Sequence, residues 1–263
     1  MKFLQLFVLL SLAFITANSQ AAVTEKDLNY AVDGKSFKGY VVYDSSIKGP
    51  RPGIIVVHEW WGHNDYARKR ARMLAKLGYT AIALDMYGDG KQASHPGDAG
   101  KFSSVLKKNL PLAEKRFMAA YHLLQQQPQT DSKNIGAIGY CFGGGIVLAM
   151  ARRGVDLKAV ASFHGGLGLG APVKNKIDSR ILVLNGAADP FVKPEQIAAF
   201  KKEMRTAGIE FEFINYPGAK HAFTNPDADN FGKKFKIPLA YNQQADERSW
   251  QKMKTFLKQS FRE

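Results

Sequence analysis

Apolar positions along the chain follow two alternating patterns. Short continuous apolar runs are typical of strands that are covered on both faces of a sheet. We expect such strands at residues 53–58, 80–86, 135–140, 160–163, 181–184 and 211–216. Between them, apolar residues recur at about every third or fourth position, which is typical of amphipathic helices. These helices are expected at residues 65–77, 112–124, 146–153, 194–207 and 245–261.

The helix expected at 65–77 has a well-defined apolar face. Tyr66, Met73, Leu74 and Leu77 share one side, and Arg70 is the charged residue that falls among them. We expect this side to pack against the sheet and the opposite, basic side to face solvent.

The order of the elements predicts the fold class. Residues 28–32 and 38–43 flank the turn sequence Asp33-Gly34-Lys35, which predicts an opening antiparallel hairpin. The alternation of strands and helices after it predicts a mostly parallel central sheet with helices on both faces, the α/β class. No internal repeat or linker divides residues 22–263, so we expect a single α/β domain. Segments 88–100 and 224–238 are rich in Gly, Asp, Asn and Pro and are interpreted as long functional loops.

Residues 1–21 have the pattern of a signal peptide. Lys2 gives a positive start, residues 3–15 form an apolar run, and Ser19-Gln20-Ala21 places small side chains where a signal peptidase reads them. The run is shorter than the roughly 20 residues of a membrane-spanning helix, although an uncleaved anchor is an alternative. We expect a mature chain that starts near Ala22 and is exported without stable membrane insertion. If the source is a Gram-negative bacterium, its compartment is the periplasm.

The composition narrows the classes of function. With 45% hydrophobic residues, the chain has enough apolar surface to fold, which excludes intrinsic disorder. Its one cysteine excludes a disulfide framework and a cysteine-rich zinc site. There are 37 Lys and Arg against 23 Asp and Glu, a formal net charge of +14, but no basic run with interleaved aromatic residues. We therefore expect a monomer that acts on a small molecule and binds no nucleic acid.

The single cysteine lies where a nucleophile is expected. The sequence Gly139-Tyr140-Cys141-Phe142-Gly143-Gly144 follows one expected strand and precedes an expected helix. A nucleophile on such a sharp, strained turn needs very small residues two positions before and after it, and Gly139 and Gly143 meet this need. The N-terminus of the following helix also favours the thiolate. A buried structural cysteine in a glycine-rich turn is the alternative.

Two further residues complete a candidate triad with Cys141. Asp189 follows the strand expected at 181–184, and His221 follows the strand expected at 211–216. The order nucleophile, acid, histidine is that of α/β-hydrolase triads. All three lie past the carboxyl ends of expected parallel strands, where open α/β sheets bind ligands. Taken singly, Asp189 is also a turn-initiating residue and His221 a solvated loop histidine, but their joint order and context favour the triad.

Together these motifs resemble the dienelactone hydrolase family of α/β hydrolases, whose members use a Cys-His-Asp triad. The resemblance implies the α/β-hydrolase fold. The resemblance covers residues 53–223, extends more loosely to the C-terminal helix, and is most specific at 139–144. The segments His58-Glu59-Trp60-Trp61-Gly62 and Asp85-Met86-Tyr87 also match. The resemblance implies that Glu59 helps the thiol lose its proton and that the N–H groups of Trp60 and Phe142 form the oxyanion hole. It also makes Tyr87 a candidate to line the pocket.

The resemblance implies a carboxylic ester hydrolase. Such an enzyme cleaves a small ester or lactone through a thioester on Cys141, as a carboxymethylenebutenolidase does. A general carboxylesterase of other small esters stays open as an alternative. So does a non-catalytic binding or thiol-relay protein of the cell envelope.

The chain departs from the family where substrate carboxylates are bound. Well-studied members place one arginine shortly after the Asp-x-Tyr segment and another shortly after the histidine. Here Asp89 and Asn225 lie near these places, and neither segment holds an arginine. Lys91 is near enough in the sequence to replace a missing arginine, but a lysine binds a carboxylate with a less defined geometry. We therefore expect neutral short-chain esters or lactones to be cleaved at least as well as a carboxylated dienelactone.

No cofactor or metal is expected. His63, His95, His122 and His164 have no acidic or cysteine partners at metal-ligand spacing and are expected to be solvated or packed. The glycine-rich run at 165–170 lacks the Gly-Lys-Ser/Thr ending of a phosphate-binding loop.

Overall fold

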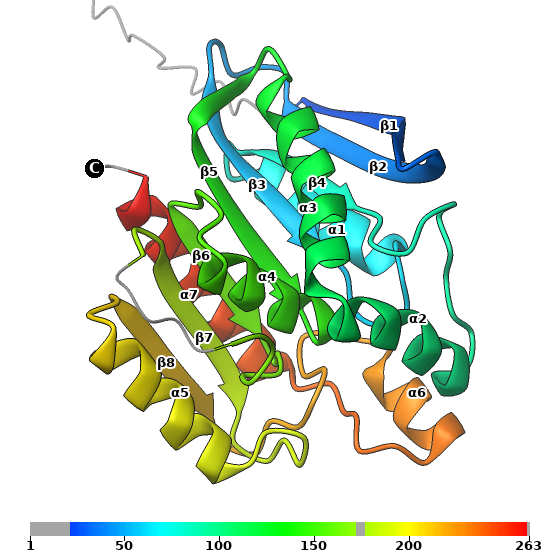
Figure 1. Cartoon of the computed structure of the whole chain (residues 1–263), viewed down its shortest axis with the longest axis vertical. Coiled ribbons are helices and arrows are strands. Elements are labelled where there is room, and N and C mark those ends of the chain that lie inside the picture. Colours follow the sequence, from blue (N-terminus) through cyan, green and yellow to red (C-terminus); the bar gives the residue numbers. More distant parts are fainter. Residues whose placement is uncertain (1–21, 172–176, 262–263) are drawn as a thin grey trace, which may run out of the picture.

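The computed structural model describes residues 22–171 and 177–261 and is built around one central sheet (Figure 1). The sheet has eight strands in the order β1-β2-β4-β3-β5-β6-β7-β8. β1 and β2 form an antiparallel hairpin, β2 is also antiparallel to β4, and all other neighbours are parallel. The strands are β1 (Val23–Val32), β2 (Lys35–Asp44), β3 (Arg51–Val57), β4 (Thr80–Leu84), β5 (Thr130–Tyr140), β6 (Ala159–Phe163), β7 (Arg180–Gly186) and β8 (Phe211–Tyr216). The expected fold class, with its opening hairpin, is confirmed.

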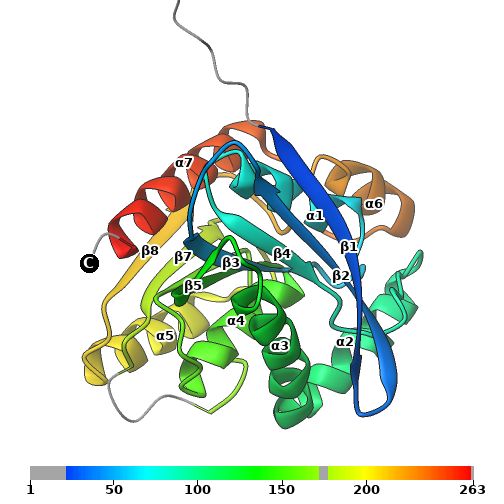
Figure 2. The same cartoon turned by 90° about the horizontal axis from the view of Figure 1, so that it is seen from above.

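Helices cover both faces of the sheet, as Figure 2 shows. α1 and α7 pack on one face, and α3, α4 and α5 cover the other. The helices are α1 (Asp65–Ala75), α2 (Pro96–Lys108), α3 (Leu110–Gln125), α4 (Phe142–Arg152), α5 (Pro194–Thr206), α6 (Ala228–Phe235) and α7 (Gln243–Ser260). None of the helices in the described ranges is long and apolar enough to cross a membrane.

Strand β3 shows why the central strands are continuous apolar runs. Ile54 and Val56 belong to the core beneath α1 and α7, whereas Ile55 and Val57 belong to the core beneath α3 and α4. All four side chains are fully buried. Successive residues of a strand point to opposite faces, so a strand covered on both sides has no polar positions.

Helices α2 and α6 overlap the segments that were interpreted as long loops, so that interpretation was wrong for residues 96–100 and 228–235. α2 begins within segment 88–100, and α6 lies within segment 224–238. The glycines of both helices and the short length of α6 hide the helical pattern, because tertiary packing rather than intrinsic propensity stabilises them. In α2 the buried residues are Ala99, Ser103 and Leu106, and in α6 the ring of Phe231 stacks on Trp61 with centroids 4.5 Å apart.

The first helix also differs from expectation on its apolar face. Because α1 ends at Ala75, Leu77 is 37% exposed instead of packed. Arg70, the charged residue on that face, is only 3% exposed. A buried guanidinium requires partners, and these lie behind the candidate active site.

Candidate active site

Cys141 lies at the sharp turn between β5 and α4. Its backbone has φ 53° and ψ −114°, a region that residues other than glycine rarely adopt. A Cβ on Gly139 would lie 2.1 Å from the Gly143 carbonyl oxygen, and one on Gly143 would lie 2.3 Å from the Val57 carbonyl oxygen. Only glycine therefore fits at these two positions, as the sequence predicted.

His221 and Asp189 are brought together at the same end of the sheet. His221 Nδ1 donates a hydrogen bond of 2.7 Å to Asp189 Oδ2, and the Phe191 N–H donates to the other carboxylate oxygen at 2.8 Å. Burial acts to lower the pKa of His221, but negative charge on Cys141 and hydrogen bonds with Asp189 and Cys141 raise it to about 10. This is the direction expected of a thiolate–imidazolium pair.

Glu59 is a buried carboxyl group next to this pair. It is 2% exposed, and its Oε2 accepts a hydrogen bond of 2.6 Å from Asn225 Nδ2. Burial raises the pKa of Glu59 to about 7, and the charge of His221 is among the weaker effects that lower it. In this structure Asn225, rather than the thiol, holds the Glu59 carboxyl group.

The N–H groups of the two expected oxyanion donors have no hydrogen-bond acceptor among the described residues. The Phe142 N–H is the first of α4, and the first N–H groups of a helix lack partners within the helix. The Glu59 carbonyl accepts from His58 Nδ1 at 2.5 Å, and the C=O and N–H of one planar peptide point in opposite directions. The Trp60 N–H therefore points away from His58, and it has no acceptor within the described residues.

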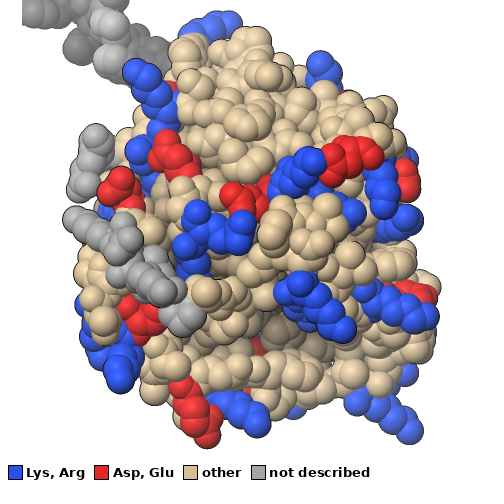
Figure 3. Space-filling model, viewed as in Figure 1, with Lys and Arg blue, Asp and Glu red and all other residues tan. Residues whose placement is uncertain are grey.

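Cys141 and His221 open into one apolar cavity of about 300 Å³. Its walls include Trp60, Phe142, Leu169, Phe191, Ile237 and Leu239. Of the described residues that line it, Lys107 from α2 is the only lysine or arginine, and it is exposed at the rim. In the view of Figure 3 the surface of the molecule has a hollow with a basic side chain at its edge.

Two residues expected at the pocket do not reach it. Tyr87 lies one layer behind the wall, where it is 7% exposed and its hydroxyl donates to the Trp60 carbonyl at 3.0 Å. Lys91 lies at the surface, where it pairs with Asp89 at 3.5 Å, and both side chains are more than half exposed. Neither Lys91 nor Asn225 is therefore placed to bind a substrate carboxylate in the cavity.

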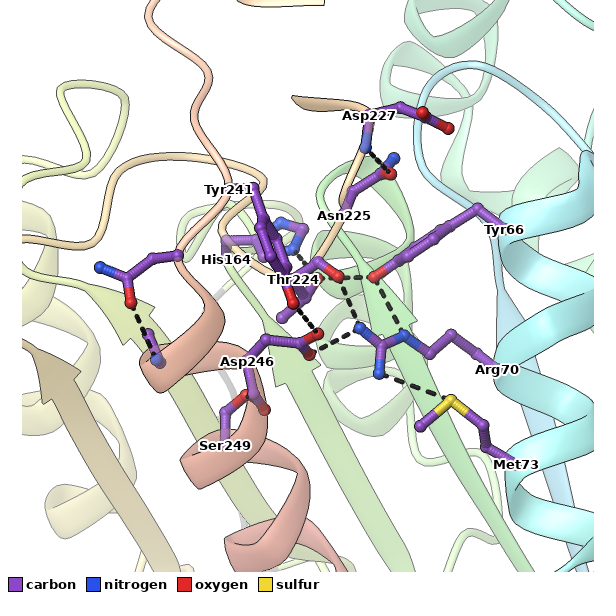
Figure 4. Close-up of polar contacts among 12 residues, drawn as sticks. Tyr66, Arg70, Met73, His164, Thr224, Asn225, Asp227, Tyr241, Asp246 and Ser249 are labelled. Carbon is purple, nitrogen blue, oxygen red and sulfur yellow. Dashed lines mark hydrogen bonds and ion pairs between the residues drawn. The ribbon is translucent and has the colours of Figure 1, made fainter. Parts of the chain in front are cut away.

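A buried polar cluster behind the cavity has no counterpart in the sequence analysis. It joins Tyr66 and Arg70 of α1, His164 after β6, Thr224 of the loop that carries His221, and Asp246 of α7 (Figure 4). Arg70 on an apolar helix face was its one signal in the sequence. Its partners could not be found because Asp246 is 176 positions away.

The described residues contain no group of histidine, cysteine and acidic side chains that could hold a metal ion. Of the histidines named in the sequence analysis, His95 caps α2, His122 contacts a glutamine at the surface, and His63 is buried.

Comparison with known proteins identifies the family of this chain. The family model described as "Dienelactone hydrolase family" matches residues 37–261. The chain belongs to the dienelactone hydrolase family. A crystal structure described as a dienelactone hydrolase-like promiscuous phosphotriesterase from metagenomic libraries has 35% sequence identity and a TM-score of 0.85. The alignment covers 90% of this chain and 98% of the chain in that crystal structure.

Two curated relatives are also similar over most of the chain. A Saccharolobus solfataricus protein named "Putative carboxymethylenebutenolidase" is 26% identical over 270 residues, covering 89% of this chain and 98% of its own. A Yersinia pestis protein with the same name is 29% identical over 240 residues, covering 84% of this chain and 82% of its own. Membership of this dienelactone hydrolase family makes the chain a hydrolase of the esterase type.

Proposed function

We propose that the chain hydrolyses small carboxylic esters or lactones through a thioester on Cys141. The Cys141 thiolate attacks the carbonyl carbon, and the N–H groups of Trp60 and Phe142 bind the oxygen that becomes negative. The leaving alkoxide takes a proton from His221, which then accepts a proton from the water that attacks the thioester. Asp189 keeps the imidazole in the orientation that both proton transfers need.

One observation supports this proposal above the others. Cys141 sits at the strained elbow on the cavity wall, and the imidazole that lines the same cavity is hydrogen-bonded to Asp189 at 2.7 Å. A structural cysteine needs neither the strained backbone nor the oriented imidazole. A thiol-relay protein needs no cavity for an acyl group.

Glu59 has a separate role in this proposal. With a pKa of about 7, its carboxyl group is able to take up or release a proton near neutral pH. Glu59 directly precedes Trp60, whose N–H is one of the two expected oxyanion donors. We infer that Glu59 takes the thiol proton as the substrate binds and passes it to His221, which leaves the thiolate and the imidazolium that the two later steps need; the family resemblance implies that Glu59 helps the thiol lose its proton.

The cavity favours neutral substrates. Its walls are mainly aromatic and aliphatic, Asn225 is bonded to Glu59, and Lys91 is paired at the surface. An apolar wall offers a carboxylate no hydrogen bond to replace its hydration. Short-chain neutral esters and lactones should therefore be cleaved at least as well as a carboxylated lactone.

The preference is tested by kcat/KM for a carboxylated lactone and for its neutral methyl ester. An advantage of more than about 100-fold for the carboxylated form, roughly 2.7 kcal/mol, would contradict the neutral preference. The same pair measured with Lys107→Met would show whether the rim lysine accounts for any such advantage.

A neutral phosphotriester is a second candidate substrate. The 35% identical relative is described as a promiscuous phosphotriesterase, and an apolar cavity also accepts a neutral triester. A panel of small esters and one phosphotriester, given to the wild type and to Cys141→Ala, tests both functions. Ester turnover that Cys141→Ala leaves unchanged would refute the thioester route.

A further inference from the structure

His164 is a fully buried histidine between the nucleophile and the loop of His221. It directly follows β6, and its backbone has φ 40°, in the left-handed region. Its ring meets the ring of His221 edge-on, with centroids 5.3 Å apart. The His164 side chain does not line the cavity, so it cannot contact a substrate there.

Two hydrogen bonds fix the ring of His164. The Cys141 N–H is shared between the Phe163 carbonyl at 3.0 Å and His164 Nδ1 at 3.1 Å, so that ring nitrogen accepts and carries no proton. The proton of the neutral ring is then on Nε2, which donates to Thr224 Oγ1 at 2.7 Å. Burial, followed by the charge of His221, holds the pKa of His164 well below its ordinary value, which keeps the ring neutral.

Thr224 is in turn fixed from the opposite side. Its hydroxyl is 2.6 Å from the Tyr66 hydroxyl, and Arg70 donates to the Thr224 carbonyl at 2.6 Å. The same Arg70 nitrogen forms an ion pair with Asp246 at 2.6 Å, as Figure 4 shows. Thr224 comes three positions after His221. Helices α1 and α7 therefore hold the loop that presents the imidazole.

Stability alone does not explain this arrangement. A buried ion pair loses hydration that its attraction barely offsets, and apolar residues of similar volume are often as stable. A histidine at positive φ adds backbone strain to this cost. The buried ion pair and the strained histidine both belong to the residues that join Cys141 to the loop of His221. Backbone strain is often found at functional sites.

We propose that His164 is a positioning residue for the Cys141–His221 pair. His164 accepts a hydrogen bond from the Cys141 N–H and donates one to Thr224. These two bonds fix the position of the nucleophile's backbone relative to the loop that carries His221. The same backbone carries Sγ and precedes the Phe142 N–H, so its orientation sets both the attack and the oxyanion contact. This inference rests on the proposed function, in which Cys141 and His221 are the reacting pair.

Two variants of His164 separate its two hydrogen bonds. In His164→Asn the amide oxygen falls near the place of Nδ1 and can still accept the Cys141 N–H. In His164→Gln the longer side chain reaches toward Thr224 but offers no acceptor at the Nδ1 position. We expect kcat of the Gln variant to be about 10-fold below that of the Asn variant, with KM changed by less than about twofold. Equal kcat values in two variants of equal thermal stability would overturn the proposal.

A second matched pair tests the contact with Thr224. Thr224→Ser keeps the hydroxyl, whereas Thr224→Val has the same shape without it. We expect the Ser variant to retain most of the wild-type kcat and the Val variant to lose about 10-fold at nearly constant KM. If the Val and Ser variants have equal kcat, or differ only in melting temperature, the proposal is wrong.

Two readouts do not depend on ester hydrolysis. Nitrogen NMR of labelled histidine should show a neutral His164 with its proton on Nε2, and this signal should be lost or mixed in Thr224→Val. Alkylation of Cys141 by iodoacetamide should be slower in Thr224→Val than in Thr224→Ser. If wild type hydrolyses no ester while both results hold, the proposed function fails and the positioning role stands. A proton found on Nδ1 would overturn the positioning role itself.

Discussion

At the scale of single residues, Glu59 shows a conflict between stability and the proposed activity. Its pKa rises from 4.5 to about 7, chiefly because it is buried. The folded chain therefore binds a proton at Glu59 more tightly than the unfolded chain does. Between these two pH values the folded state loses stability as the pH rises, and above about pH 7 the full cost is present.

Replacing Glu59 by glutamine should remove that cost. At about pH 8 the free energy of unfolding of Glu59→Gln should exceed that of the wild type, by at most about 3 kcal/mol. At about pH 4 the two should converge, because the wild-type carboxyl is then protonated in both states. Urea denaturation at both pH values measures the difference, and kcat should fall in the same variant.

The exposed Glu247 on α7 provides the control. Glu247→Gln should leave the free energy of unfolding within about 0.5 kcal/mol of the wild type at either pH. A Glu59→Gln variant whose stability tracks the wild type at every pH would show that this carboxyl carries no burial cost.

At the scale of elements, the turn between β5 and α4 depends on its glycines. A Cβ on Gly143 would lie 2.3 Å from the Val57 carbonyl oxygen and 2.6 Å from that of His58, and backbone atoms in a central strand have little room to move. Gly143→Ala should therefore lower the free energy of unfolding by about 3 kcal/mol or more.

Gly100 in α2 is the matched control for Gly143. A Cβ there meets nothing within 4 Å and its φ is not positive, so Gly100→Ala should raise the free energy of unfolding by about 0.5–1 kcal/mol. Denaturation of both variants in urea measures the contrast. Similar stabilities for the two would mean that the elbow tolerates a side chain.

The elements also show which parts of the fold can be predicted from the sequence alone. Runs such as 53–58 and the glycines around Cys141 predicted strands and turn well, because both follow from local sterics and two-sided burial. Helix α6 was missed because its helical register depends on Phe231 stacking against the distant Trp61. The partners of Arg70 were missed for the same reason, since an ion pair across 176 positions leaves no local pattern.

At the scale of the whole molecule, Ala22 is hydrogen-bonded to the end of the opening hairpin. The Ser45 N–H donates to the Ala22 carbonyl at 2.9 Å, and the pairing of β1 with β2 begins at Val23. Cleavage just before Ala22 would therefore leave every pair of the opening hairpin intact. Removal of residues 1–21 during export stays a prediction.

Export predicts a defined N-terminus. Mass spectrometry of protein from a cell-envelope extract should show a chain that begins near Ala22. Leu9→Arg, which places a charge inside the apolar run, should leave full-length protein in the cytoplasm. An intact Met1 on soluble cytoplasmic wild-type protein would contradict both cleavage and the periplasmic location.

The proposal as a whole depends on a covalent intermediate at Cys141. Wild-type protein mixed with excess p-nitrophenyl acetate and quenched in acid should gain the mass of one acetyl group. Peptide mapping should place that group on Cys141, and hydroxylamine should remove it. His221→Ala, which lacks the base for the second step, should retain any acetyl group that it gains for longer. Steady ester turnover with the acetyl group on another residue, or with undiminished rate in Cys141→Ala, would contradict the account.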